Sequence, residues 1–331
     1  MKIAVVGDHC LDIDYIGEYD GLMSREIERL PVFNCSSVRY SGGGAANIVQ
    51  LLSGLGAEVY PAGAYGDVEG EILMDKVWQA HEGIWDNEET VDWMIEGQPT
   101  PSFIKYYQGS GQHIFRMNKK SEPLKLTIEA QLIENIGQLA VDAIIVADYD
   151  ETGNGIVTFG ILDAIIKRPG LKFGTSRTRP SVFGDFDYVV LSEKESQKCD
   201  VEEYGDLDEP RLIITKGADG ACMYSNLFYM RHDRPHEIAL IDKDKHLTKD
   251  IDICGCGDSF LSAFVIKKLE GLDDLECLRW GNAAGRAQAR KLYGAHTFTW
   301  QEIGMEYTDL YGMNMAERRQ RFGKLQIQYT S

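Results

Sequence analysis

Apolar positions along the chain alternate between short β-branched runs and longer stretches with helical spacing. Residues 2–7, KIAVVG, are an apolar run that ends at a glycine, which is typical of a buried parallel strand. Residues 42–56, GGGAANIVQLLSGLG, open on three glycines and then repeat apolar residues at helical spacing until Gly56. The pattern predicts a buried strand and, further along, an amphipathic helix.

The alternation continues to residue 294. Residues 11–40 have no helical period and predict short strands and turns, whereas residues 102–118 predict a β-hairpin around a glycine-containing turn. Further strands are predicted at 58–66, 142–150, 186–195, 211–220 and 221–230, and further helices at 69–83, 258–271 and 275–294. Strands that alternate with helices of this length predict an α/β fold with a mainly parallel sheet covered on both faces.

Ligands of such sheets bind at the carboxyl ends of the strands. The polar residues that follow the predicted strands are therefore candidates for a binding site. They are Asp8, Asp12, Asp148, residues 192–195, residues 216–220 and residues 252–258.

Composition and charge limit the classes of protein to which this chain can belong. A chain of 331 residues with a net charge of -18 fits one large α/β domain, and its acidity argues against a nucleic-acid surface, although a local basic cluster can still bind a small anion. The seven cysteines are odd in number and have no framework spacing, as in a reduced cytosolic protein. No apolar run reaches the length of a membrane span or of a signal peptide. We expect a soluble cytoplasmic protein without a membrane partner.

The stretch DICGCGDSFLSAF, residues 252–264, allows three interpretations. Cys254 and Cys256 could bind a metal, but a structural zinc site needs four ligands and no second Cys/His pair lies nearby. An ordinary glycine-rich helix start is common, because an acid such as Asp258 in a first turn favours the helix dipole. The third interpretation is an anion-binding turn whose carboxylate takes a proton from an attacking hydroxyl.

Two common phosphate-binding loops are excluded. The chain contains no G-x-x-x-x-G-K-[ST] sequence, which argues against a P-loop nucleotide hydrolase. No G-x-G-x-x-G sequence follows the first strand, where residues 5–12 contain a single glycine, so a Rossmann dinucleotide site is poorly supported.

The order of three segments carries a resemblance to a known family. VVGDHCLDID at 5–14, SGGGAANIVQLLSGLG at 41–56 and DICGCGDSFLSAFV at 252–265 resemble the signatures of the ribokinase-like (PfkB) carbohydrate kinases. The similarity covers roughly residues 1–300. The segments 7–17, 24–26 and 146–150 are most similar to the heptose-7-phosphate kinase domain of ADP-heptose synthases, and residues 7–13 also resemble fructosamine kinases. The resemblance implies a three-layer α/β/α fold with a small β-sheet lid.

The resemblance also implies roles for individual residues at the sugar site. Asp258 is the expected general base, and the backbone N–H groups of Gly255, Cys256 and Gly257 are the expected anion hole. The expected sugar-binding residues are Asp12, assisted by Asp8, then Gly42, Gly43 and Asn47 of the glycine turn, and more weakly Arg116 and Asp148. For the glycines an ordinary helix start is the alternative, and for Arg116 and Asp148 an exposed surface role.

The nucleotide site is inferred in the same way. The turn from Thr215 to Gly220, with Lys216 and Gly217, resembles the family's turn beside ATP, and Asn282 stands where the family often contacts adenine. A helix-to-helix hydrogen bond is the alternative for Asn282. The resemblance implies Mg²⁺ between the β- and γ-phosphates, with Glu195 matching the acid of the family's N-x-x-E element and acting through water.

Several positions depart from the family pattern. Cys256 stands where alanine is usual and Ile253 where threonine is common. Ser192 replaces the asparagine of N-x-x-E, residues 173–180 replace an Asp-Pro-Lys stretch, and no lysine follows Tyr149. Arg177 or Arg179 is a candidate replacement for the missing positive charge, with an exposed basic loop as the alternative.

Taken together, the residues and the resemblance predict an ATP-dependent kinase of a sugar or sugar phosphate. The lid is expected at about 12–40 and 98–118, and a C-terminal helical extension at 301–331. Closure of the lid would exclude water, and the resemblance implies a homodimer through it as one assembly. The alternatives are a relative that binds a sugar or nucleotide without turnover, and a nucleoside kinase.

Overall fold

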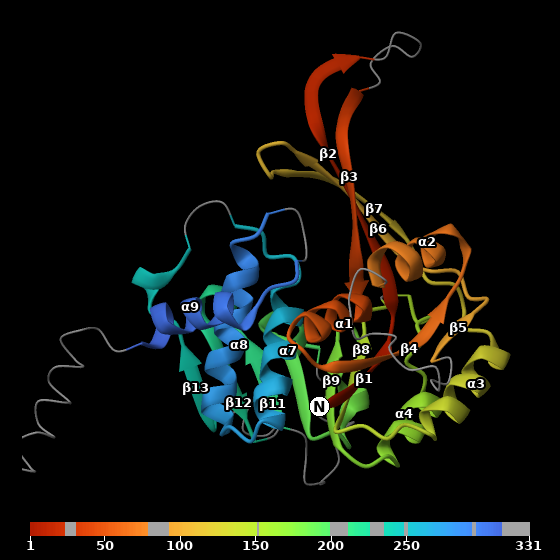
Figure 1. Ribbon diagram of the computed structural model, residues 1–331, viewed down its shortest axis with the longest axis vertical. Helices are drawn as coiled ribbons and strands as arrows, with labels where there is room; N and C mark the ends of the chain where they lie inside the picture. The colour runs from red at the N-terminus through yellow and green to blue at the C-terminus, as the bar shows by residue number, and fades with distance from the viewer. Residues whose placement is uncertain are drawn as a thin grey trace, which may run out of the picture.

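The computed structural model describes residues 1–23, 31–78, 93–150, 152–198, 211–225, 235–247, 251–292 and 296–312. Two sheets and the helices around them make up the fold (Figure 1). The strands are β1 (Lys2–Gly7), β2 (His9–Met23), β3 (Pro31–Gly44), β4 (Glu58–Tyr65), β5 (Met94–Glu96), β6 (Ser102–Gln108), β7 (His113–Lys119), β8 (Ala143–Asp148), β9 (Leu171–Ser176), β10 (Tyr188–Ser192), β11 (Arg211–Thr215), β12 (Gly220–Tyr224) and β13 (Glu237–Leu240). The α-helices are α1 (Ala45–Gly54), α2 (Asp67–Ile72), α3 (Leu126–Ile136), α4 (Phe159–Ile166), α5 (Glu193–Ser196), α7 (Cys256–Leu269), α8 (Asp274–Ala289) and α9 (Trp300–Tyr311).

The large sheet has the order β13-β12-β11-β10-β9-β8-β1-β4-β5. Its strands from β11 to β5 pair in parallel, and only β12 and β13 run antiparallel to their neighbours. The carboxyl ends of β1, β8 and β10 therefore meet at one edge, where the predicted site residues follow them. This arrangement confirms the predicted α/β fold with a mainly parallel sheet.

Alternate residues of the buried strands feed two cores on opposite faces of this sheet. Ile3 and Val5 of β1 pack with α1, α7 and α8, whereas Ala4 and Val6 pack with α3 and α4. The period of two along a strand sends successive side chains to opposite faces, so a strand covered on both sides must be apolar throughout. The KIAVVG run meets that requirement.

The small sheet has the order β3-β2-β6-β7. Its first two strands are long, and Figure 1 shows them extending together from the body of the molecule. The prediction of short strands and turns over 11–40 was therefore wrong. The sequence LDIDY at 11–15 alternates apolar and polar residues, which is the pattern of a half-buried strand, and the prediction overlooked it. Residues 24–26, which carried part of the family likeness, lie outside the described residues.

Two helices differ from their predicted form. The helix expected at 69–83 begins as α2 and continues as a π-helix, Leu73–Trp78, and its later part lies outside the described residues. The C-terminal helix α9 is not an appendage, because Ile303 and Leu310 belong to the core that α7 and α8 share. Residues 313–331 lie outside the described residues. Within the described ranges, none of the helices has the length and apolarity needed to cross a bilayer.

Candidate active site

The site centres on Asp258 in the first turn of α7. Gly255 caps this helix with φ 75°, a left-handed conformation that glycine adopts without strain. Cys256 donates its backbone N–H to the Ile253 carbonyl at 3.3 Å, so one of the three predicted anion-hole amides is already engaged. The next amide, that of Gly257, stands in the first turn, where a helix has no backbone acceptor of its own. A Cβ added to Gly257 would meet nothing within 4 Å, so the backbone here is open to a ligand.

Two side chains hold the Asp258 carboxylate, one on each oxygen. Asn47 donates its Nδ2–H to Oδ2 at 2.5 Å, and the Tyr149 hydroxyl donates to Oδ1. Burial raises the pKa of Asp258, and the hydrogen bonds from Tyr149 and Asn47 oppose that rise. A carboxylate with a raised pKa is a stronger base at neutral pH. Asn47 therefore orients the candidate base, rather than acting only as the predicted sugar contact.

Asp8 organises the loop after β8. Its Oδ2 accepts the backbone N–H groups of Tyr149 at 2.9 Å and Asp150 at 3.0 Å, and its Oδ1 accepts that of Ile156 at 2.8 Å. Burial raises the pKa of Asp8 to about 7, against the opposing effect of these bonds. Asp8 lines the basic cavity described below, and its hydrogen bonds fix the turn that carries Tyr149.

Asp12 belongs to a buried charged trio on one face of the small sheet. The Lys105 ammonium donates to Asp12 Oδ2 at 2.5 Å and lies 3.9 Å from Asp14 Oδ1. Lys105 and Asp14 are 3% and 0% exposed, and Asp12 Oδ1 accepts no hydrogen bond from any described residue. The charge of Asp12 contributes to the raised pKa of Asp258, which places the two acids in one neighbourhood. The unpartnered Oδ1 is the atom that suits the predicted sugar hydroxyl.

The glycine turn lets backbone approach this trio closely. A Cβ on Gly43 would collide with Asp12 Oδ1, and one on Gly42 would collide with Gln50 and the backbone of Ala46. Gly42 also donates its N–H to Gln50 Oε1 at 2.5 Å. Both glycines are therefore required by their contacts, and Gly43 in particular keeps the place of Asp12.

We expect Gly43→Ala to lower the free energy of unfolding by about 1–3 kcal/mol, as overpacking of a tight site does. The measurement is urea unfolding followed by circular dichroism. Gly304→Ala in α9 is the matched control, because nothing lies within 4 Å of a Cβ there and helix propensity predicts a gain of up to about 1 kcal/mol. Equal effects of the two variants would contradict the collision with Asp12.

The prediction that Asp148 contacts the sugar is contradicted by its position. Asp148 is fully buried, its Oδ2 accepts from the Ser176 hydroxyl at 2.7 Å, and its Oδ1 accepts from Arg179 at 2.8 Å. The same contacts engage Arg179, which also donates to the Val157 carbonyl at 2.9 Å. A carboxylate whose two oxygens hold neighbouring side chains in the interior supports the loop and does not face a ligand.

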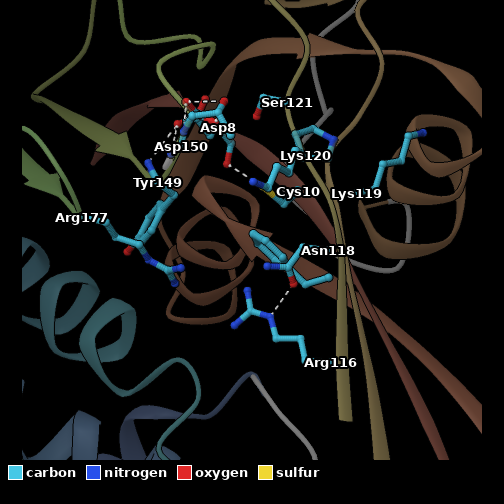
Figure 2. Close-up of a pocket in the computed structure, with 13 residues that line it drawn as sticks. Asp8, Cys10, Arg116, Asn118, Lys119, Lys120, Ser121, Tyr149, Asp150 and Arg177 are labelled. Carbon is cyan, nitrogen blue, oxygen red and sulfur yellow. Dashed lines mark hydrogen bonds between the residues drawn. The ribbon is translucent and has the colours of Figure 1, made fainter.

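A basic cavity opens beside Tyr149, between the small sheet and the loops after β8 and β9 (Figure 2). It encloses about 450 Å³ of empty space, part of it open to solvent. Four cationic side chains line it, namely Arg116, Lys119, Lys120 and Arg177. Lys119 forms ion pairs with Asp67 and Glu69 of α2, and Arg116 donates to Asn118 Oδ1 at 2.7 Å and lies over the Phe103 ring. Asp8 and Asp150 line the same cavity, so its cationic side chains outnumber its acidic ones by four to two in a chain of net charge -18.

A second, larger cavity lies on the other side of the α7 turn and brings the nucleotide candidates together. It encloses about 1140 Å³, again counting space open to solvent. Ser192, Thr215, Gly217, Gly220 and Asn282 all line it, together with Cys256 and Gly257. Lys216 does not line it but closes the same turn by donating its N–H to Gly220 at 2.7 Å.

Asn282 has a clear structural role in this cavity. Its Nδ2 donates to the Ala239 carbonyl at 2.6 Å and to the Tyr311 hydroxyl at 2.7 Å, which ties α8 to β13 and α9. The alternative of a helix-to-helix hydrogen bond is thus realised between α8 and α9. Its side-chain oxygen is the atom left for a base edge.

Glu195 and Ser192 form a capping box at the start of α5. Ser192 donates its N–H to Glu195 Oε2 at 2.8 Å, and Glu195 donates its N–H to Ser192 Oγ at 3.2 Å. Serine at the family's asparagine position is therefore explained locally, as a helix cap. The charge of Glu195 helps to raise the pKa of Tyr149, after the larger effects of burial and Asp258, which places this acid near the candidate base.

Sequence reasoning missed Tyr149 and Lys105 altogether. Both make their contacts with residues far away in the sequence, Tyr149 with Asp258 and Lys105 with Asp12. In the sequence, Tyr149 was mentioned only because no lysine follows it. Arg177 was named as a candidate and does line the basic cavity, with its guanidinium 5.0 Å from the centre of the Tyr149 ring.

The interpretation of Cys254 and Cys256 as a metal-binding pair gains no support. Among the described residues, no group of three or more His, Cys, Asp or Glu side chains is arranged to hold a metal ion. Cys256 directs its Sγ to the Asp252 carbonyl at 3.7 Å.

Comparisons with known proteins bear on this geometry. Residues 191–300 match the family described as pfkB family carbohydrate kinase. The D-beta-D-heptose 7-phosphate kinase of Bordetella bronchiseptica is 23% identical over 331 residues, which cover 93% of this chain and 96% of that protein. The bifunctional protein HldE of a Nitratiruptor species is 21% identical over 91% of this chain, but this chain covers only 64% of its length.

A solved structure shares the fold. The crystal structure of phosphofructokinase-2 from Escherichia coli in complex with substrates and products superposes with a TM-score of 0.70 and 18% sequence identity. The match covers 94% of this chain and 99% of that one. It confirms the predicted ribokinase-like arrangement of a large, mostly parallel sheet and a small second sheet.

Proposed function

We propose that the chain is a carbohydrate kinase of the PfkB type, which transfers the γ-phosphoryl group of ATP to a hydroxyl of a sugar or sugar phosphate. One observation supports the proposal: the neighbours of Asp258 line two different cavities. Cys256 and Gly257 of its turn line the larger cavity, whereas its hydrogen-bond partner Tyr149 lines the basic one. A base at the junction of a nucleotide cavity and a sugar cavity stands where the phosphoryl group must cross.

The chemistry follows from that placement. Asp258 takes the proton of the substrate hydroxyl, and the oxygen then bonds to the γ-phosphorus as the bond to the departing ADP oxygen breaks. The open amide of Gly257 faces the charge that develops on the phosphoryl group, assisted by the positive end of the α7 dipole. Asp12 Oδ1 accepts a second sugar hydroxyl and orients the ring.

We expect a magnesium ion to bind together with the nucleotide. Among the described residues, one side chain, Glu195, is a candidate to help hold it. Glu195 is near Tyr149 and uses one carboxylate oxygen in its capping box, which leaves the other to hold a water of the ion. A single outer acid matches an ion held mainly by phosphate oxygens and water. When bound, the ion neutralises charge on the phosphates.

The cations of the basic cavity favour a sugar that already carries a phosphate. Arg116 and Lys120 enter from β7 and the residue after it, and Arg177 faces them across the cavity (Figure 2). A kinase that resembles the heptose 7-phosphate kinases would act on a sugar that already carries a phosphate.

We expect Arg116→Gln with Lys120→Gln to raise the KM for a sugar phosphate by about ten- to a hundredfold, the worth of one or two charged hydrogen bonds. The KM for the same sugar without phosphate should barely change. Lys167→Gln with Lys172→Gln is the control for net charge, because both lie at the far end of α4 and the start of β9. Equal losses on both substrates would contradict a phosphate subsite.

The experiment that tests the function itself is ADP release from Mg-ATP across sugars, sugar phosphates, fructosamines and nucleosides. Turnover with one sugar or sugar phosphate supports the proposal and names the substrate. Turnover with nucleosides alone would make the protein a nucleoside kinase. Ligand-induced thermal shifts without ADP release would make it a binding protein that has lost catalysis.

We also propose a homodimer through the small sheet. Its outer face, opposite the Asp12 and Lys105 face, exposes Val38, Phe115 and Met117 around the stacked rings of Tyr15 and Tyr106. An apolar face of this kind on a projecting sheet is typical of an interaction surface. Sedimentation velocity over a range of protein concentrations measures the assembly.

A further inference from the structure

The Tyr149 hydroxyl is hydrogen-bonded to one oxygen of the candidate base. It donates to Asp258 Oδ1, while Asn47 donates to Oδ2. The hydroxyl of a substrate must reach the same carboxylate before its proton can be taken. Tyr149 lines the basic cavity, so its ring stands on the side from which that hydroxyl arrives.

The turn that carries Tyr149 is fixed, whereas its hydroxyl is held by a single described partner. The Tyr149 N–H and the Asp150 N–H both donate to Asp8 Oδ2, and the guanidinium of Arg177 lies 5.0 Å from the ring centre. These contacts hold the backbone and the ring face. They leave the hydroxyl able to change partners through a small rotation of the side chain.

We propose that Tyr149 is a cap on the catalytic base, which occupies Asp258 until a sugar hydroxyl displaces it. This inference rests on the proposed function and adds a positioning residue to it. A water molecule makes fewer contacts in the cavity than a sugar does, and is therefore a poorer competitor for the place of the phenol. The cap reserves the base for the sugar and suppresses transfer of the phosphoryl group to water.

The cap also adjusts the strength of the base. A hydrogen bond donated to a carboxylate stabilises its charged form, and the bond from Tyr149 lowers the pKa of Asp258 against the effect of burial. In a protein without the phenol, the pKa of Asp258 is higher and the free carboxylate is more basic. Burial and the nearby Asp258 charge raise the pKa of Tyr149 well above its ordinary value, so the phenol stays protonated and remains a donor.

Phosphoryl transfer to the sugar and hydrolysis of ATP by water make and break the same bonds. In each, the attacking oxygen bonds to the γ-phosphorus, the bond to the ADP oxygen breaks, and the attacking group gives its proton to Asp258. The acceptor is a sugar hydroxyl in transfer and water in hydrolysis. A cap that only the sugar displaces efficiently changes the ratio of the two rates.

The test compares Tyr149→Phe with the native protein in the presence of Mg-ATP, with and without the sugar substrate. We expect sugar-independent ATP hydrolysis to rise by about tenfold relative to transfer, the factor that one hydrogen bond is worth. The acidic limb of the pH profile of kcat/KM should move to higher pH, because the Asp258 pKa rises without the phenol. Phenylalanine keeps the ring under Arg177, so the fold is retained.

Tyr188→Phe is the matched control. Its hydroxyl also donates to a carboxylate, Asp274 Oδ1 at 3.2 Å, but it lies at the amino end of β10, away from the site. An unchanged hydrolysis ratio and an unmoved pH limb in Tyr149→Phe would overturn the cap, even though the native protein phosphorylates a sugar. A native protein that releases no ADP with any acceptor would instead overturn the proposed function.

Discussion

Asp258→Asn should reduce kcat for phosphoryl transfer by at least about a hundredfold, the lower bound of what a general base contributes. Asparagine has nearly the same shape and keeps an oxygen for the Tyr149 hydroxyl, but it cannot accept the proton of a substrate. Nucleotide-induced thermal shifts should persist, because the larger cavity is lined by other residues. The measurement is the initial rate of ADP release at saturating sugar and Mg-ATP.

The control for this substitution is Asp273→Asn. Asp273 caps α8 by accepting the Glu276 N–H at 2.9 Å, and asparagine is an equally good cap, so activity should not change. The pH profile adds a second check. Because burial raises the pKa of Asp258, activity should fall as the pH drops through that pKa, since the protonated acid accepts no further proton. An Asp258→Asn protein that retains most of its activity would reduce Asp258 to an acid at a helix start.

The parts of the site that could be read from the sequence are local in the chain. The α7 turn combines its glycines and its acid within four residues, and the turn at 42–44 likewise carries its constraint in consecutive positions. The residues of such a motif are close together because they are consecutive in the chain, whatever the tertiary structure. The apolar runs of β1 and β8 were equally readable, because a strand buried on both faces is apolar at every position.

The parts that could not be read depend on register and on contacts across the fold. Lys105 meets Asp12 only because β6 pairs in parallel with β2, with Asp14 directly opposite Lys105. No property of residue 105 in isolation signals that partner. Asp148 was misjudged for the same reason, since its position at a strand end suggested a ligand, whereas Arg179 and Ser176 take both of its oxygens.

Lys105→Met should lower the free energy of unfolding at pH 7 by about 3–5 kcal/mol, as removal of one partner from a buried ion pair does. The variant leaves Asp12 and Asp14 charged, close together and without the Lys105 ammonium, on a face where Asp14 is 0% exposed. In the native protein, Asp12 and Asp14 keep the Lys105 pKa raised although burial alone would lower it. Urea unfolding gives the measurement.

Two further variants separate this loss from simpler effects. Lys2→Met removes an exposed pair with Glu58, 3.4 Å apart, and should lower the stability far less, because water screens the two charges. Lys105→Met combined with Asp14→Asn removes one of the stranded charges and should recover part of the stability. A loss in Lys105→Met no larger than that in Lys2→Met would contradict a buried trio.

The free energy of unfolding should depend on pH through the protonation of Asp14. Burial raises the pKa of Asp14 to about 6 in the folded protein, above its ordinary value of 3.8, so the folded state binds a proton that the unfolded state releases between these values. The stability linked to that proton is present below about pH 4 and is lost as the pH rises through about 6. Without Lys105 the folded pKa rises further, so the deficit of Lys105→Met should shrink as the pH falls from 7 towards 5. A deficit that is constant over this range would show that lost packing around the lysine stem, and not the stranded carboxylates, causes the instability.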